Sequence, residues 1–227
     1  MLRFLSERSE RAVKLLRLNR PVERKACPMN SFIFRFTKIV AKIALRPFFQ
    51  IQATGLTNIP EKGSFILLPK HQRWEDIPLL GITIQRPLYY IAKTELFKNP
   101  ISRWFITSLG GISLKREQPI KSRESFRLMM KLLQEGEGLV LFPEGTYYRD
   151  RVGAGHAGMM KMILSRFTIP CIPVGIRYSK KGWRTEVRIA MGNPVHGDSL
   201  KNVHEIIEHI MRDIAKLSGF SDSRTGL

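Results

Sequence analysis

Short apolar runs bounded by turn residues alternate along the chain with longer stretches in which apolar positions fall three or four apart. The first pattern is typical of buried strands and the second of amphipathic helices. Strands are predicted at residues 51–56, 65–68, 88–92, 112–114, 139–142, 169–178 and 185–191, and helices at residues 76–83, 97–109, 122–135, 158–167 and 199–217. The last two strands are expected to pair with each other. This alternation predicts an α/β fold with a mostly parallel sheet flanked by helices.

The first 52 residues follow a different pattern. Residues 2–18 predict a basic helix, and residues 31–50 predict a second, amphipathic one. At about 100° per residue, the basic side chains of this second helix fall within an arc of roughly 80°. They are Arg35, Lys38, Lys42 and Arg46. A narrow basic stripe on a wide apolar surface is typical of a helix lying in a membrane interface, although a helix packed on the core with snorkelling lysines gives the same pattern.

Composition adds a strong charge to this picture. The chain carries 38 Lys and Arg against 19 Asp and Glu, a net charge of +19, which favours polyanionic partners such as nucleic acid, an anionic membrane or phosphorylated substrates. Cys27 and Cys171 are too few for a disulfide framework, which indicates a reducing compartment. We expect neither a transmembrane helix, which needs a run of about 18 apolar residues, nor a signal peptide. The expected domains are a membrane-docking segment at 1–52 and an α/β domain at 53–227.

The first candidate catalytic residue is His71, on the loop after the predicted strand at 65–68. Asp76 comes five positions later, where an acid followed closely by Pro78 is typical of a helix start. Residues five apart do not share a helix face, so the two side chains meet only if the chain turns between them. A histidine can take a proton from a hydroxyl, and a carboxylate on its other ring nitrogen orients it. The alternative is a loop histidine beside an unrelated capping aspartate.

A base of this kind needs a nucleophile to activate. The chain has no G-x-S-x-G elbow, because residues 111–115 lack the closing glycine. Cys171 lies in an apolar run, where a thiol more often packs than reacts. We therefore expect the substrate to supply its own hydroxyl.

Two further polar side chains, Arg116 and Glu144, directly follow predicted strands. Ligands of parallel sheets bind at the carboxyl ends of the strands, so both are expected near His71. Arg116 could grip a phosphate with two nitrogens, or it could belong to a solvated basic turn. Glu144 precedes Gly145, where the backbone can approach a ligand, and could bind a polyol or hold an arginine.

The remaining histidines point to no site. His156 belongs to a glycine-rich segment before a predicted helix, whose free amides suit an anion. The spacing fits neither nucleotide-binding fingerprint, and we expect a structural or exposed side chain. His196, His204 and His209 lack the spacing of metal ligands, so no metal is predicted.

Taken together, four segments resemble the glycerolipid acyltransferase family, that of the 1-acyl-glycerol-3-phosphate acyltransferases. They are His71-x4-Asp76, the segment 111–116, Phe142-Pro-Glu-Gly-Thr146 and the segment 172–174, in this order. The resemblance covers roughly residues 52–195. It implies that His71 is the base on the acceptor hydroxyl and that Asp76 orients it.

The resemblance also implies the substrate contacts. Arg116, Glu144, Gly145 and Thr146 would hold the phosphate and glycerol of the acceptor, and residues 172–174 would serve the acyl chain or the structure. The donor would be an acyl thioester of coenzyme A or acyl carrier protein, used as a co-substrate without a further cofactor.

Two positions depart from the family pattern. Arg73 stands where the family often has serine, and Tyr147 stands where an arginine often follows the threonine of the third segment. Arg149 could replace that arginine as a substrate-binding cation, or the acceptor head group could differ from a simple phosphomonoester.

These observations lead to one hypothesis with several rivals. We expect a peripheral acyltransferase on the cytoplasmic face of the cell membrane, with 1-acyl-glycerol-3-phosphate as the first candidate acceptor and phosphatidic acid as product. No nucleic acid partner is expected. The rivals are an acyltransferase for another lysolipid, a lipid hydrolase that uses water as acceptor, and a non-catalytic module that binds membrane or nucleic acid through its charge.

Overall fold

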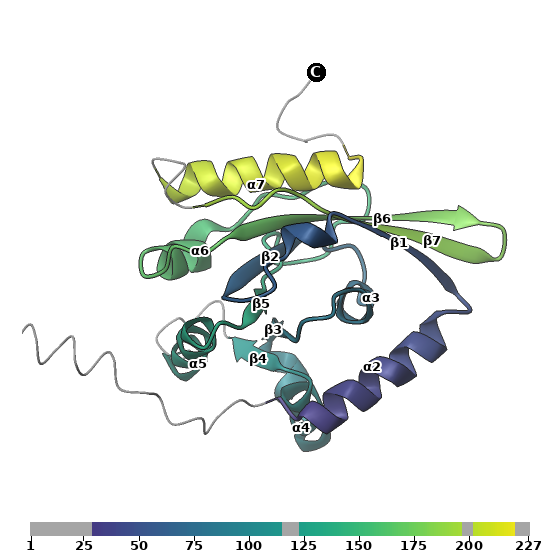
Figure 1. Cartoon of the computed structure of the whole chain (residues 1–227), viewed down its shortest axis with the longest axis horizontal. Helices are drawn as coiled ribbons and strands as arrows, with labels where there is room; N and C mark the ends of the chain where they lie inside the picture. The colour runs from purple at the N-terminus through teal and green to yellow at the C-terminus, as the bar shows by residue number, and fades with distance from the viewer. Residues whose placement is uncertain (1–28, 115–122, 197–201, 221–227) are drawn as a thin grey trace, which may run out of the picture.

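The computed structural model describes residues 29–114, 123–196 and 202–220, and Figure 1 shows a sheet flanked by helices. The predicted helix at residues 2–18, together with Cys27 and Arg116, lies outside these ranges. The sheet has seven strands in the order β1-β7-β6-β2-β5-β3-β4. They are β1 (Phe49–Thr54), β2 (Phe65–Pro69), β3 (Leu88–Lys93), β4 (Gly111–Leu114), β5 (Gly138–Val140), β6 (Cys171–Lys181) and β7 (Arg184–Met191). Every neighbouring pair is parallel except β6 and β7, which confirms the predicted mostly parallel sheet.

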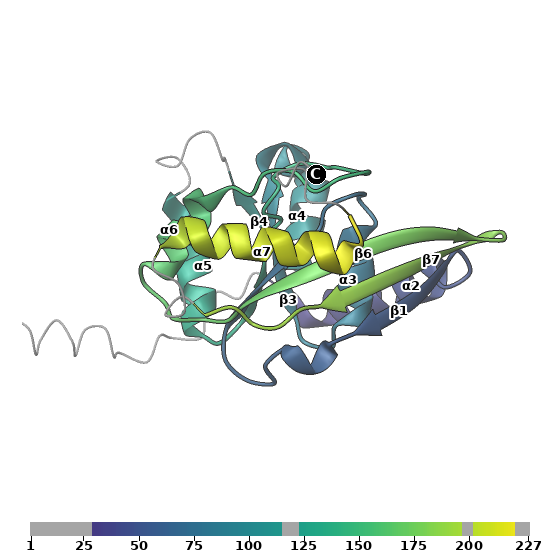
Figure 2. The same cartoon turned by 90° about the horizontal axis from the view of Figure 1, so that it is seen from above.

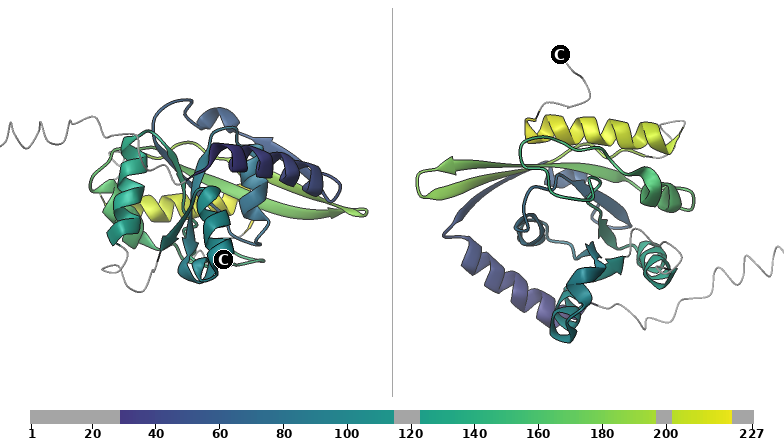
Figure 3. Two further views of the ribbon diagram at one scale, coloured as in Figure 1. Left: turned by 90° about the horizontal axis from the view of Figure 1, so that it is seen from below. Right: turned by 180° about the vertical axis from the view of Figure 1, so that it is seen from behind.

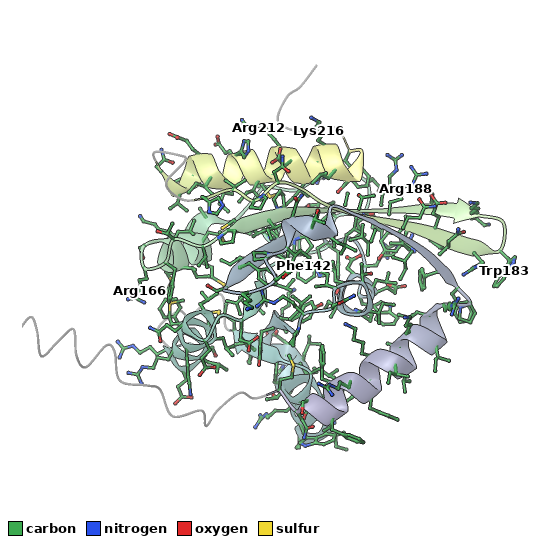
Figure 4. All side chains as sticks on the ribbon, viewed as in Figure 1. Phe142, Arg166, Trp183, Arg188, Arg212 and Lys216 are labelled. Carbon is green, nitrogen blue, oxygen red and sulfur yellow. The ribbon has the colours of Figure 1, made fainter. Side chains whose placement is uncertain are left out.

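Helices cover both faces of the sheet. They are α2 (Ser31–Leu45), α3 (Asp76–Thr83), α4 (Pro100–Ser108), α5 (Arg123–Gln134), α6 (Ala157–Leu164) and α7 (Val203–Ser218). Figure 2 shows α7 lying over one face, and Figure 3, seen from the opposite side, shows α2 in front of the other. In Figure 4, Arg212 and Lys216 stand on the side of α7 that points away from the sheet. None of the described helices combines the length and the apolar character needed to cross a bilayer.

Strand β2 shows how the core is divided. All of its residues are buried, as expected for a central strand covered on both faces. Phe65 and Leu67 belong to the apolar cluster that contains α3, whereas Ile66 and Leu68 belong to the cluster that contains α5, α6 and α7. The reason is that successive side chains of a strand point to opposite faces.

Pro47 sets a boundary that the sequence pattern missed. The helix predicted at residues 31–50 ends at Leu45, because proline has no backbone N–H with which to continue it. The chain then enters β1 at Phe49, which pairs in parallel with β7. The sheet therefore begins before residue 52, where we expected the two domains to divide.

A second proline splits the helix predicted at residues 97–109. A 3-10 turn, η2 (Thr94–Phe97), comes first, and α4 begins at Pro100. Asn99 caps α4 by accepting a hydrogen bond of 2.8 Å from the backbone N–H of Ile101. This cap places η2 and the first turn of α4 beside the carboxyl end of β3.

The last two strands form the expected pair. Strand β6 runs antiparallel to β7 along its length, from Val174 opposite Met191 to Lys181 opposite Arg184. This hairpin extends beyond the rest of the sheet in Figures 1 and 2, and Trp183 lies at its tip in Figure 4.

Candidate active site

The loop between β2 and α3 brings His71 and Asp76 together, as the sequence predicts. His71 Nδ1 lies 3.0 Å from Asp76 Oδ2, and the aspartate is fully buried. The same oxygen accepts hydrogen bonds from the backbone N–H groups of Gln72 at 2.7 Å and Arg73 at 2.9 Å. These bonds fold the loop back over the first turn of α3, which begins at Asp76.

Tyr178 completes the surroundings of this carboxylate. Its hydroxyl donates a hydrogen bond of 2.5 Å to Asp76 Oδ1. Burial raises the pKa of Tyr178, and the negative charge of Asp76 raises it further, so the phenol keeps its proton and remains a donor. Asp76 accepts a hydrogen bond from the Nδ1–H group of His71. The other ring nitrogen, Nε2, therefore keeps the lone pair that a base needs. Sequence reasoning missed Tyr178, since it appeared only as the last residue of a predicted strand.

The ring of His71 is wedged between two aromatic rings. Phe142 stacks on it with centroids 3.7 Å apart, and Tyr147 lies tilted against it at 4.2 Å. The residue is only 8% exposed, yet it lines a cavity of about 830 Å³. The cavity lies between the carboxyl ends of β3 and β4, η2 and the loop after β5, and its wall is largely apolar, including Ile77, Tyr90, Ile91, Ala92, Leu96 and Leu114.

Glu144, predicted to bind substrate, is not among the residues that line this cavity. It is buried and forms an ion pair of 2.9 Å with Lys70, whose side chain is equally buried. Its oxygens also accept the backbone N–H of His71 at 3.0 Å and of Gly153 at 2.7 Å. Glu144 therefore positions the loop of His71 and is fully engaged by the protein. Lys70 was missed, because a lysine just after a strand resembles an ordinary exposed loop residue.

The other residues of the predicted third segment do surround the site. Gly145 and Thr146 line the same cavity as His71. Gly145 has a φ of 71°, a left-handed conformation that favours glycine. Arg149 is exposed and does not line this cavity, but it lines a second hollow that Tyr147 also borders. Arg116 lies outside the described residues.

Neither a cysteine nor a serine is among the described residues that line the cavity of His71. Cys171 is fully buried, and burial raises the pKa of its thiol to about 12, so the reactive thiolate is suppressed. His156 is exposed and precedes α6, which fits its expected non-catalytic place. Across the described ranges, no group of three or more His, Cys, Asp or Glu is arranged to hold a metal ion.

The predicted docking helix α2 turns much of its apolar surface outward. Its exposed hydrophobic side chains are Phe32, Phe36, Ile39, Val40 and Ile43. Arg35, Lys42 and Arg46 are exposed as well. Lys38 is instead half-buried and donates a hydrogen bond of 2.6 Å to the backbone oxygen of Ile84, and burial lowers its pKa. Lys38 thus contacts the α/β domain and is not a free member of the basic stripe.

Comparisons with known proteins show which chains this one is similar to. A chloroplastic 1-acyl-sn-glycerol-3-phosphate acyltransferase of Arabidopsis thaliana is 28% identical over 171 residues, which are 70% of this chain and 48% of that protein. A 1-acyl-sn-glycerol-3-phosphate acyltransferase of Bacillus subtilis is 27% identical over 172 residues, 72% of this chain and 83% of that one. The chain thus spans about half the length of the chloroplastic relatives that it matches.

A solved structure and a family model complete the comparison. The crystal structure of the 1-acyl-sn-glycerophosphate acyltransferase PlsC of Thermotoga maritima superposes with a TM-score of 0.65 at 25% identity, covering 92% of this chain and 88% of that one. The family model described as Acyltransferase matches residues 50–177, which contain His71, Asp76 and the segment 142–146. This match includes more than half of the chain, which therefore belongs to the acyltransferase family.

Proposed function

We propose that the protein is an O-acyltransferase that moves a fatty acyl group from a thioester to the free hydroxyl of a lysophospholipid. The observation that carries the proposal is the ring of His71, held at Nδ1 by a buried carboxylate while it lines a cavity with apolar walls. Membership of the acyltransferase family and the activity for which the relatives are named support it.

The chemistry follows from this pair. His71 takes the proton of the acceptor hydroxyl as its oxygen attacks the thioester carbonyl. Asp76, which accepts from Nδ1, stabilises the imidazolium that forms. When the tetrahedral intermediate collapses, the carbon–sulfur bond breaks and the imidazolium returns the proton to the departing thiolate. The products are an ester and a free thiol, and no covalent enzyme intermediate is required.

The cavity suits a lipid substrate. Apolar side chains at the ends of β3 and β4 give an acyl chain a surface that excludes water. Thr146 and Gly145 line the cavity beside His71, where the glycerol of 1-acyl-glycerol-3-phosphate would lie with its free hydroxyl. Arg116 is the proposed phosphate ligand from the second segment. Acyl coenzyme A or acyl carrier protein is the proposed donor.

We further propose that the protein is a peripheral membrane protein that binds the cytoplasmic face of the cell membrane. Two neighbouring helices support this. The exposed apolar face of α2 is continued on α4 by Ile101, Trp104 and Phe105, and the backbone bond from Asn30 N–H to Ser108 O joins the two helices. Arg35 and Lys42 would meet anionic lipid head groups, so lipid and phosphorylated substrates account for the basic charge without a nucleic acid partner.

The test is a transfer assay with purified full-length protein, lysophosphatidic acid and acyl coenzyme A, in which free thiol and lipid products are measured together. His71→Ala should lower the rate about 10²-fold to 10⁴-fold, since the base is lost. His156→Ala, an exposed histidine away from the cavity, is the matched control and should keep full activity. Free fatty acid in place of diacyl product would identify a hydrolase. Equal rates for His71→Ala and the wild-type protein would remove the proposal.

A further inference from the structure

A second hollow shares Tyr147 with the cavity of His71. It measures about 400 Å³ and is lined by Gln72, Arg73, Trp74, Glu75, Tyr147 and Arg149. Tyr147 borders both spaces, and its ring centroid is 4.2 Å from that of His71. A group bound in this hollow would therefore contact a residue that packs against the proposed base.

Two guanidinium groups face this hollow without an acidic partner. Neither Arg73 nor Arg149 forms an ion pair among the described residues, although Glu75 also lines the space. Both arginines are exposed and remain free to bind a solute. Guanidinium groups bind phosphate oxygens through paired hydrogen bonds, so two of them around one hollow favour a phosphate group.

Arg73 is held in place by the residues that orient His71. Its guanidinium carbon lies 4.5 Å from the centroid of the Tyr178 ring, and the hydroxyl of Tyr178 donates to Asp76. The backbone N–H of Arg73 donates to the same carboxylate at 2.9 Å. A cation fixed in this way loses little freedom on binding an anion.

We propose that Arg73 and Arg149 bind the phosphate of the acceptor lipid, an inference that rests on the proposed acyl transfer. A phosphomonoester has three terminal oxygens, so the two guanidinium groups that line this hollow can share one phosphate.

The acceptor and the donor differ in the distance between their phosphate and their reacting group. This difference favours the acceptor as the source of the phosphate. In 1-acyl-glycerol-3-phosphate, the phosphate is on the carbon next to the one that carries the free hydroxyl. In acyl coenzyme A, the whole pantetheine arm separates the thioester from the first phosphate. A phosphate held beside Tyr147, which packs against His71, therefore fits the acceptor better than the donor.

The test compares Arg73→Gln, Arg149→Gln and the double variant with Arg151→Gln. Arg151 belongs to the same loop as Arg149 and lines neither space, so it is the matched control. Each single variant should raise KM for lysophosphatidic acid about 10-fold to 100-fold with a smaller change in kcat, as expected for lost hydrogen bonds to a charged group. With 1-monoacylglycerol, which has no phosphate, the variants should match the wild-type protein. Unchanged KM values for lysophosphatidic acid would overturn the proposal.

To test whether the arginines bind the donor instead, KM is measured for acyl coenzyme A and for acyl-pantetheine, which lacks the phosphates. A rise in KM for acyl coenzyme A that disappears with acyl-pantetheine would assign the arginines to the donor and overturn the acceptor assignment. These comparisons are made once transfer by the wild-type protein is shown to depend on His71. Failure of that dependence is a failure of the proposed function, whereas intact dependence with unaffected variants is a failure of this inference alone.

A binding measurement provides a readout apart from activity. Trp74 lines the second hollow and is 64% exposed. With the other two tryptophans changed in Trp104→Phe/Trp183→Phe, its fluorescence should respond to glycerol 3-phosphate with saturation, and the response should be lost in Arg73→Gln/Arg149→Gln. An identical response in the presence and absence of the two arginines would contradict the proposal.

Discussion

Replacing Lys70 with methionine tests whether the buried ion pair beneath His71 organises the site. Lys70 Nζ lies 2.9 Å from Glu144 Oε2, and neither side chain is exposed. The ammonium also donates to the backbone oxygens of Tyr148 at 2.6 Å and His71 at 3.2 Å. Burial lowers the pKa of Lys70, and Glu144 acts in the opposite direction. One cation thus joins the two loops that carry the site, and methionine keeps its length while removing its charge and donors.

The expected loss of stability is large. Removing one member of a buried ion pair costs about 3–5 kcal/mol, because the remaining charge stays buried without a partner. With a urea slope of about 2.5 kcal/mol per M, a loss of about 4 kcal/mol lowers the unfolding midpoint by about 1.6 M. The double variant Lys70→Met/Glu144→Gln should recover part of the loss, since it leaves no unpaired charge.

Urea unfolding followed by circular dichroism measures these midpoints, with Lys181→Met as the control. Lys181 pairs with Glu186 at 3.5 Å, but its side chain is 62% exposed, and such pairs contribute about 0–1 kcal/mol. The reasoning is refuted if Lys70→Met and Lys181→Met shift the midpoint equally. It is also refuted if the losses of Lys70→Met and Glu144→Gln simply add in the double variant.

Three further predictions follow from the described contacts. Tyr178→Phe removes one donor to Asp76 and should lower kcat about tenfold, as for a lost hydrogen bond to a charged group; an unchanged kcat would exclude a positioning role. Burial raises the pKa of Cys171 from 9.0 to about 12. The unfolded thiol therefore ionises first, and the wild-type protein should lose about 1.4 kcal/mol relative to Cys171→Ala between pH 8 and pH 10 in unfolding experiments; parallel stability curves would contradict this. Ile43→Glu, on the exposed face of α2, should weaken flotation with anionic vesicles about tenfold, whereas Met162→Glu on α6 should not, and equal flotation would argue against docking through α2.

The parts of the fold that depend on local pattern could be predicted from the sequence. The apolar run at 65–68 indicated β2, and the acid and proline in the first turn of α3 indicated its start at Asp76. The end of α2 was missed because apolar spacing continues past Pro47, although proline cannot continue the hydrogen bonding of a helix. The same reason explains the missed break before Pro100.

The site was predictable only where its contacts are local. His71 and Asp76 are five residues apart, so the loop between a strand and a helix was enough to suggest their meeting. Lys70 and Glu144 are 74 positions apart, and Tyr178 is 102 positions from Asp76. Apolar spacing carries no information on such pairs, because it does not show which distant side chain will compensate a buried charge.

The pairing of Glu144 also bears on catalysis, because its carboxylate accepts the backbone N–H of His71 at 3.0 Å. The ammonium of Lys70 pairs with the same carboxylate at 2.9 Å and donates to the backbone oxygen of His71 at 3.2 Å. The backbone of His71 is therefore held on both sides by one buried ion pair, and loss of the pair would allow the imidazole to move relative to Asp76.

Lys70→Met should therefore lower kcat in addition to its effect on stability, because the ion pair that holds the loop of His71 is lost. The rate is measured in the absence of urea and in parallel for Lys181→Met, where no loss is expected because Glu186 lines neither the cavity nor the second hollow. A folded Lys70→Met protein with the kcat of the wild-type protein would show that the buried pair contributes to stability alone. A lower kcat in the folded variant would show that the pair also positions His71.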